Sequence, residues 1–132
     1  VLNQIALSLT PGIGSVLTRQ LISYCGSASE VFRSPKRKLT RIPGIGEKIA
    51  ESVLARTAFS VADYVYEQAI KQEVNVLFYT HKDYPNRLKN LPDAPVLLYS
   101  KGSAQLNATK VVAIVGTRNA TAYGKKVTEE IV

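Results

Sequence analysis

The residues best suited to chemistry lie near the end of the chain, in the run VVAIVGTRNATAYG at Val111–Gly124. The apolar, mostly β-branched residues Val111–Val115 predict a central parallel strand that is covered on both faces. A tight turn follows, and Thr121 or Asn119 can cap the helix expected after it. Free amides at a helix start favour an anion, and the Arg118 guanidinium is suited to phosphate. We therefore expect a phosphate-binding turn that includes Gly116, Thr117, Arg118, Asn119 and Thr121, with Lys125 close by.

This turn does not match a nucleotide-binding fingerprint. It lacks two of the three glycines of G-x-G-x-x-G, and it has no G-K-[ST]. An ordinary strand-turn-helix with a solvated Arg118 is therefore the alternative.

A second candidate site lies in an internal repeat. The segments Leu9–Gly14 and Arg41–Gly46 share P-G-I-G and are set 32 residues apart, each between two helix-compatible segments. The unit resembles the helix-hairpin-helix motif, in which the hairpin amides and the N-terminus of the second helix hold a nucleic-acid phosphate. Ile13 and Ile45 would fill the space between the two helices of each unit. The candidate phosphate contacts are Gly12, Gly14, Gly44, Gly46 and Lys48.

Alternatives remain for this half of the chain. Glu47 would repel a phosphate, and Thr18 stands where the motif favours a small residue such as Ala50. Tandem hairpins can also be purely structural or dock another protein. The basic run of Arg33, Lys36, Arg37, Lys38 and Arg41 is either a phosphate-contacting patch or a solvated loop.

Helix and strand patterns divide the chain into two parts. A helix is expected over residues 60–73, with apolar spacing through Val61, Val65, Ala69 and Ile70, and strands over 75–79 and 96–99. Three prolines break the link between the strands, which should hold a short helix at 86–90. The fold class expected is α+β to α/β. We expect residues 1–57 to form a helical tandem helix-hairpin-helix domain and residues 58–132 to begin a parallel α/β domain that is incomplete.

Composition limits the classes of function. The 132 residues carry a formal charge of +7, which favours a polyanionic partner, and no apolar run is long enough to cross a bilayer. Cys25 is the single cysteine, with no base or metal partner near it in sequence, so a reducing, cytoplasmic setting fits. The chain has no methionine and ends within a helix, so we expect it to be part of a longer protein.

Several spaced motifs agree in order with one family. They are Tyr84-Pro85-x-x-Leu88-x-x-Leu91, Pro95-Val96-Leu97-Leu98-Tyr99-x-x-Gly102 and A-I-V-G-T-R-x-A-T-x-Y-G. The chain closely resembles the DNA-processing protein A family, DprA or Smf. The resemblance implies a non-enzymatic protein that binds single-stranded DNA and loads the RecA recombinase onto it during natural transformation. It implies that residues 1–57 are the family's SAM-like domain and that residues 58–132 begin its Rossmann-like domain. It also implies Arg118 in the DNA pocket and a homodimer in the complete protein, with later residues completing the pocket.

A nucleotide-processing enzyme of the Rossmann type is the main alternative. Catalysis would need an acid or base near the turn, yet Asp83 and Asp93 lie in another loop, and Glu129 and Glu130 lie further along the helix. His81 has no partner in view. No metal cluster, nucleophile triad or cofactor motif is present in the sequence, so we predict no catalysis, no metal and no cofactor.

Overall fold

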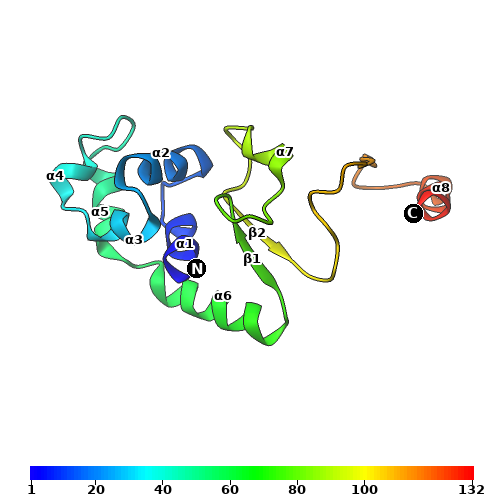
Figure 1. The fold of residues 1–132 in the computed structure, drawn as a ribbon, viewed down its shortest axis with the longest axis horizontal. Coiled ribbons are helices and arrows are strands. Elements are labelled where there is room, and N and C mark those ends of the chain that lie inside the picture. The colour runs from blue at the N-terminus through cyan, green and yellow to red at the C-terminus, as the bar shows by residue number, and fades with distance from the viewer.

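The computed structural model describes residues 1–132 as a helical body followed by a small sheet and a separate C-terminal helix (Figure 1). Five helices build the two repeats. A longer helix then leads into a two-stranded sheet, and an irregular segment with turns and bends leads to the last helix. The elements are α1 Leu2–Leu9, α2 Ser15–Cys25, α3 Ala28–Arg33, α4 Lys36–Leu39, α5 Glu47–Ala55, α6 Phe59–Lys71, β1 Asn75–Phe78, α7 Asn86–Lys89, β2 Leu97–Ser100 and α8 Ala122–Ile131.

The helical half is built from two copies of one unit, as the repeat predicts. The tandem helix-hairpin-helix pairs α1 with α2 and α4 with α5, and each hairpin lies between the two helices. Equivalent positions of the two units, which are 32 residues apart, are buried in the same way: in five such pairs both residues are buried. These pairs are Leu7 and Leu39, Thr10 and Ile42, Ile13 and Ile45, Thr18 and Ala50, and Leu21 and Val53.

The first glycine of each hairpin is required by its backbone. Gly12 has φ +82° and Gly44 has φ +77°, which is the left-handed region that side chains disfavour. The two hairpins also pack reciprocally. A methyl group on Gly44 would lie 3.2 Å from Leu17 Cδ2, and one on Gly12 would lie 3.8 Å from Ile49 Cγ1. Since Leu17 and Ile49 each follow their own hairpin glycine by five residues, each unit packs its second helix against the other unit's hairpin.

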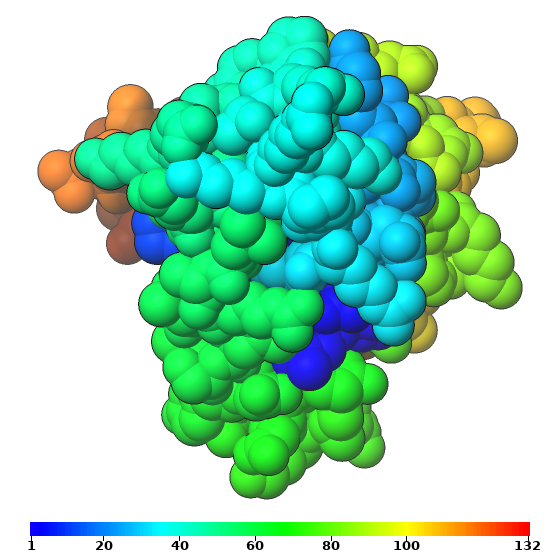
Figure 2. All heavy atoms as spheres, turned by 90° about the vertical axis from the view of Figure 1, so that its left-hand side faces the viewer, coloured from blue at the N-terminus to red at the C-terminus, as the bar shows by residue number.

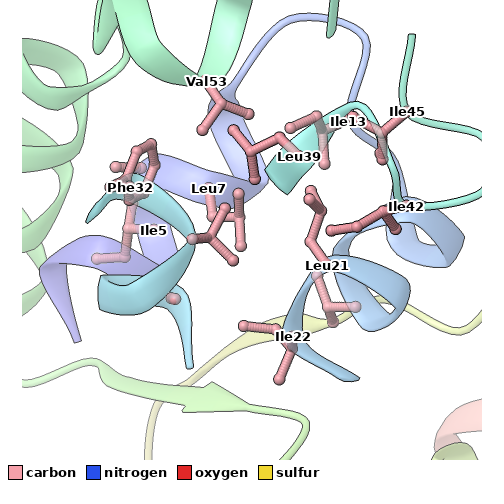
Figure 3. Close-up of a cluster of buried hydrophobic side chains, with 14 of the residues drawn as sticks. Ile5, Leu7, Ile13, Leu21, Ile22, Phe32, Leu39, Ile42, Ile45 and Val53 are labelled. Atoms are coloured by element: carbon pink, nitrogen blue, oxygen red, sulfur yellow. The ribbon is translucent and has the colours of Figure 1, made fainter. Parts of the chain in front are cut away.

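One apolar cluster of 17 buried residues fills the interior of the helical half, and Figure 3 shows part of it. Most of its members come from the two repeats, including the two hairpin isoleucines that were expected to fill the space between helices. The cluster continues beyond the repeats through Ala62 of α6, Phe78 of β1 and Val96. The sheet is therefore anchored to the helical half by shared core residues.

Helix α6 forms as predicted, and two of its four expected apolar positions lie on the packed face: Ala69 is buried and Val65 is partly buried. Val61 and Ile70 are exposed, contrary to the expected spacing, and Ala62 is buried instead. Helix α6 packs along α1. Small alanine side chains allow two helices to approach closely, so they rather than the larger Val61 and Ile70 face the neighbouring helix.

Strands β1 and β2 pair antiparallel, from Asn75 opposite Ser100 to Phe78 opposite Leu97. The parallel sheet expected of a Rossmann-like domain is therefore absent from residues 1–132. A parallel pair needs a crossover element, usually a helix of several turns, to carry the chain back along the sheet. Between β1 and β2 the only helix is α7, which has four residues, so the chain returns in the opposite direction.

The loop between the strands is closed by one buried tyrosine. Tyr84 is fully buried, and its hydroxyl donates a hydrogen bond to the carbonyl of Pro95, just before β2. Tyr84→Phe is expected to lower the free energy of unfolding by about 1–2 kcal/mol, because it leaves that carbonyl without its donor. Urea unfolding would measure the change. Tyr99→Phe is the matched control, since the Tyr99 side chain is 50% exposed, and equal effects of the two variants would contradict the prediction.

The strand expected over Val111–Val115 does not form. This segment has no regular secondary structure and is exposed, with Val112 at 82% and Val115 at 91% relative exposure, and it pairs with no other strand. A strand needs a neighbour to receive its backbone hydrogen bonds, and β1 and β2 pair only with each other. The helix after the turn forms as predicted: α8 begins at Ala122, and the Thr121 hydroxyl accepts a hydrogen bond from the Gly124 amide at 3.1 Å.

Candidate nucleic-acid interface

The turn before α8 presents its polar groups to solvent. Residues 116–121 are exposed, and Thr117 closes the bend by donating its hydroxyl to the Asn119 carbonyl at 2.9 Å. Arg118 makes no hydrogen bond or ion pair within the protein. Lys125 is also unpaired, whereas Lys126 lies 3.9 Å from Glu130 Oε1. The turn therefore has an unpaired guanidinium next to a capped helix start, which is chemically suited to a phosphate.

Each hairpin leaves a set of backbone amides without an acceptor. Ile13 N donates to the Thr10 carbonyl at 3.1 Å, and Ile45 N donates to the Ile42 carbonyl at 3.0 Å. The next amides with a backbone acceptor are those of Thr18 and Ala50. The amides that lie between these bonded positions, at residues 14–17 in the first hairpin and at residues 46–49 in the second, donate to no group in the protein. Two equivalent sets of free donors therefore lie at the starts of α2 and α5.

The charge in front of the second hairpin differs from the sequence expectation. Lys36 Nζ pairs with Glu47 and also lies 2.8 Å from Glu51 Oε1. The hydrogen bonds to Glu47 and then Glu51 raise the pKa of Lys36, and the hydrogen bond from Lys36 lowers the pKa of Glu51. Glu47 is thus partly neutralised, which weakens its expected repulsion of a phosphate. Lys48 is exposed and forms no ion pair, so it remains available to an anion.

The basic run divides into paired and unpaired cations. Arg33 lies 3.1 Å from Glu30 Oε1, and Lys36 is held by the two glutamates of α5. The other three cations form no ion pair and border one open hollow with Tyr24. The hollow is lined by Tyr24, Pro35, Arg37, Lys38, Arg41 and Ile42. Sequence reasoning missed Tyr24, because it lies on α2, well before the run, and only folding places it there.

Arg19 was also missed, and it joins the two halves of the structure. Its guanidinium lies 4.6 Å from the centre of the Tyr79 ring, and its Nη1 donates to the Lys89 carbonyl at 3.4 Å. Burial raises the pKa of the Tyr79 hydroxyl, and the Arg19 charge partly opposes that rise. These contacts connect α2 to the loop between β1 and β2.

His81 has a neighbour after all, contrary to the sequence expectation. Asp83 Oδ2 lies 3.8 Å from His81 Nδ1, but the Asp83 amide donates a hydrogen bond to that same nitrogen at 3.2 Å. The amide and the carboxylate of Asp83 thus approach the same ring nitrogen, and the 3.8 Å between the carboxylate and that nitrogen is too long for a hydrogen bond. The pair therefore lacks the carboxylate-to-N–H hydrogen bond that orients a catalytic histidine.

No helix in the structure combines the length and the apolar character needed to pass through a bilayer.

Two family models match separate parts of the chain. Residues 5–57 match the SAM-like helix-hairpin-helix tandem, and residues 75–132 match the DNA recombination-mediator protein A family. The first match covers both hairpins. The second covers the sheet, the turn with Arg118 and α8.

Curated relatives agree with these matches. The chain is 40% identical over 62 residues to the DNA processing protein DprA of Bacillus subtilis, covering 46% of this chain and 21% of the relative. It is 28% identical over 134 residues to the Protein Smf of Synechocystis, covering 96% of this chain and 33% of the relative. It is also 38% identical over 52 residues to the UvrABC system protein C of Hahella chejuensis, covering 39% of this chain and 8% of the relative.

The chain thus spans about a fifth to a third of the length of the DprA and Smf relatives it matches. No protein of solved structure shows significant similarity to it.

Proposed function

The chain belongs to the DprA/Smf family, and from this membership we propose that it acts in a DNA recombination mediator that binds single-stranded DNA. In the complete protein, this activity would load RecA onto incoming DNA in the cytoplasm during natural transformation, through a homodimer. The family match over residues 75–132 carries the proposal, because that range contains the turn with Arg118. The net charge of +7 supports a polyanionic partner.

The proposed chemistry is phosphate binding with little reading of bases. Arg118 would form charge-assisted hydrogen bonds to a backbone phosphate, and the free amides at the start of α8 would hold another of its oxygens. Thr117 and Asn119 keep the bend in place through their hydrogen bond, and Lys125 adds positive charge on the next helical turn. Gly116 leaves room for the DNA backbone beside the turn, because it has no side chain.

The fold around this turn is part of the proposal. We propose that Val111–Val115 becomes a buried strand of a Rossmann-like domain once further strands supply edges for it. Five exposed apolar residues in sequence support this, since such a segment is costly to leave in water. In this view residues 1–57 and 58–132 contribute to two domains that share core residues such as Ala62 and Phe78. The phosphate-binding turn then lies at the carboxyl end of a strand, where α/β sheets bind ligands. No catalytic activity is proposed.

Arg118→Ala in the full-length protein is expected to weaken binding of single-stranded DNA by about 1.5–3 kcal/mol, the usual contribution of hydrogen bonds to a charged group. Fluorescence anisotropy with a labelled oligonucleotide, at several salt concentrations, measures the change. Lys126→Ala is the matched control, because Lys126 carries the same charge on α8 but is near Glu130. Equal affinities of wild type and Arg118→Ala would remove Arg118 from the site, and turnover of a nucleoside monophosphate would favour an enzyme instead.

A further inference from the structure

We propose that the helical half carries a second binding site for single-stranded DNA, in which the Tyr24 ring stacks on a base while Arg37, Lys38 and Arg41 hold the adjacent phosphates. The four residues come from α2, α4 and the second hairpin, and they border the same open hollow. We call this set the basic hollow. The basic hollow is separate from the turn at Arg118. The choice of single-stranded DNA as its partner rests on the proposed function, which this second site deepens.

The cations of the basic hollow are available to a ligand. Of the five basic residues between positions 33 and 41, two are engaged by carboxylates: Arg33 by Glu30, and Lys36 by Glu47 and Glu51. The remaining three are exposed and form no ion pair, and no carboxylate lines the hollow. Three positive charges without a local counter-charge attract a polyanion and release its counterions on binding.

The aromatic ring distinguishes this surface from a simple solvated loop. The Tyr24 residue is 55% exposed and borders the hollow beside the cations, with Pro35 and Ile42 as its apolar lining. An aromatic face next to a positively charged groove is the usual way to hold single strands without sequence preference, since any base can stack on the ring. In duplex DNA the bases are already stacked on one another, so the ring favours a single strand.

The position of the basic hollow also suits a strand of DNA. Figure 2 shows the segment around α4 at the front of the molecule, uncovered by later parts of the chain. Arg41 and Ile42 begin the second hairpin, whose amides at residues 46–49 are free to bind a further phosphate. A strand leaving the basic hollow along this hairpin would therefore meet more donors.

The test compares two double variants of the full-length protein that remove the same charge. Arg37→Gln/Arg41→Gln removes two unpaired cations of the basic hollow, and Arg33→Gln/Lys71→Gln removes two cations that face glutamates. Binding of labelled oligo(dT) is measured against salt concentration. The first variant is expected to reduce the slope of log affinity against log salt by about 1.4, which corresponds to two phosphate contacts on a single strand, and the second to leave it unchanged. Equal slopes for the two variants would overturn the proposal.

The ring is tested separately by Tyr24→Leu and Tyr24→Phe. Tyr24→Leu is expected to lower affinity about fivefold or more, and Tyr24→Phe to retain it, because phenylalanine also stacks on a base. Photo-cross-linking of bromodeoxyuridine-substituted DNA should map to Tyr24. Equal affinities of the Leu and Phe variants, without a cross-link at this position, would overturn the stacking role. Circular dichroism and thermal melting verify that each variant is folded.

The same variants are made in the Arg118→Ala protein to separate the two sites. If the basic hollow binds DNA, its charge variant lowers affinity whether or not residue 118 is arginine, so failure of the turn at Arg118 does not remove this result. The alternative partner is an acidic protein segment, and a poly-glutamate peptide serves as its probe. If the charge variant binds poly-glutamate more weakly than the wild type does but binds oligo(dT) equally well, the proposal is overturned and the surface is assigned to a protein partner.

Discussion

Leu39→Ala is expected to lower the free energy of unfolding by about 2–5 kcal/mol, the usual cost of a large-to-small change in a packed core. The Leu39 side chain is 0% exposed and belongs to the central cluster. Leu7 is its counterpart in the first repeat and is also fully buried, so Leu7→Ala should cost a similar amount. The cluster joins both repeats to α6 and β1, and we expect either cavity to destabilise the helical half and the sheet together.

Urea unfolding followed by circular dichroism measures this effect, and thermal melting gives an independent value. Leu54→Ala is the matched control on α5, because Leu54 is 38% exposed and its truncation leaves no closed cavity. An effect of Leu39→Ala within about 1 kcal/mol of the control would show that the site collapses onto its neighbours. A large effect of Leu39→Ala with none for Leu7→Ala would show that the two repeats do not share one core.

Gly44→Ala is expected to destabilise the protein by about 1–3 kcal/mol, because alanine is strained at a positive φ. The added methyl group would also lie 3.2 Å from Leu17 Cδ2, closer than an ordinary contact. Gly12 has a similar φ, but a methyl group added there would lie 3.8 Å from Ile49 Cγ1, which is an ordinary contact distance. The destabilisation by Gly12→Ala should therefore be smaller. The order of the two costs thus tests the reciprocal packing of the hairpins.

The second glycine of each hairpin supplies the control. Gly14 and Gly46 precede α2 and α5 in extended conformations, and a methyl group on either would meet no atom within 4 Å. Gly14→Ala and Gly46→Ala should therefore cost about 0.5–1 kcal/mol, the difference between glycine and alanine at a helix N-cap. Urea unfolding ranks the four variants. Equal costs for Gly44→Ala and Gly46→Ala would contradict the requirement for a positive φ.

The elements whose signals lie within a few neighbouring residues were predicted correctly. The hairpins of the two P-G-I-G copies, the helices around them and the buried Ile13 and Ile45 follow from local backbone preferences and from apolar spacing. The helix cap also follows, as Thr121 is one of the two candidates that the sequence offers. The position of α7 follows from the prolines around it. The family resemblance also came from motifs that are contiguous or closely spaced in the sequence, and the family match over 75–132 confirms it.

Features that depend on a distant partner were decided only by the tertiary structure. Val111–Val115 has strand composition but no neighbouring strand, and the pairing of β1 with β2 is antiparallel because the link between them holds no long helix. The basic run is continuous in sequence, yet the packing of α5 against α4 lets Lys36 form ion pairs with Glu47 and Glu51. The packing of α2 in turn brings Tyr24 beside the cations that remain. Composition and spacing specify local conformation, whereas pairing, burial and charge neutralisation depend on residues brought together from elsewhere in the chain.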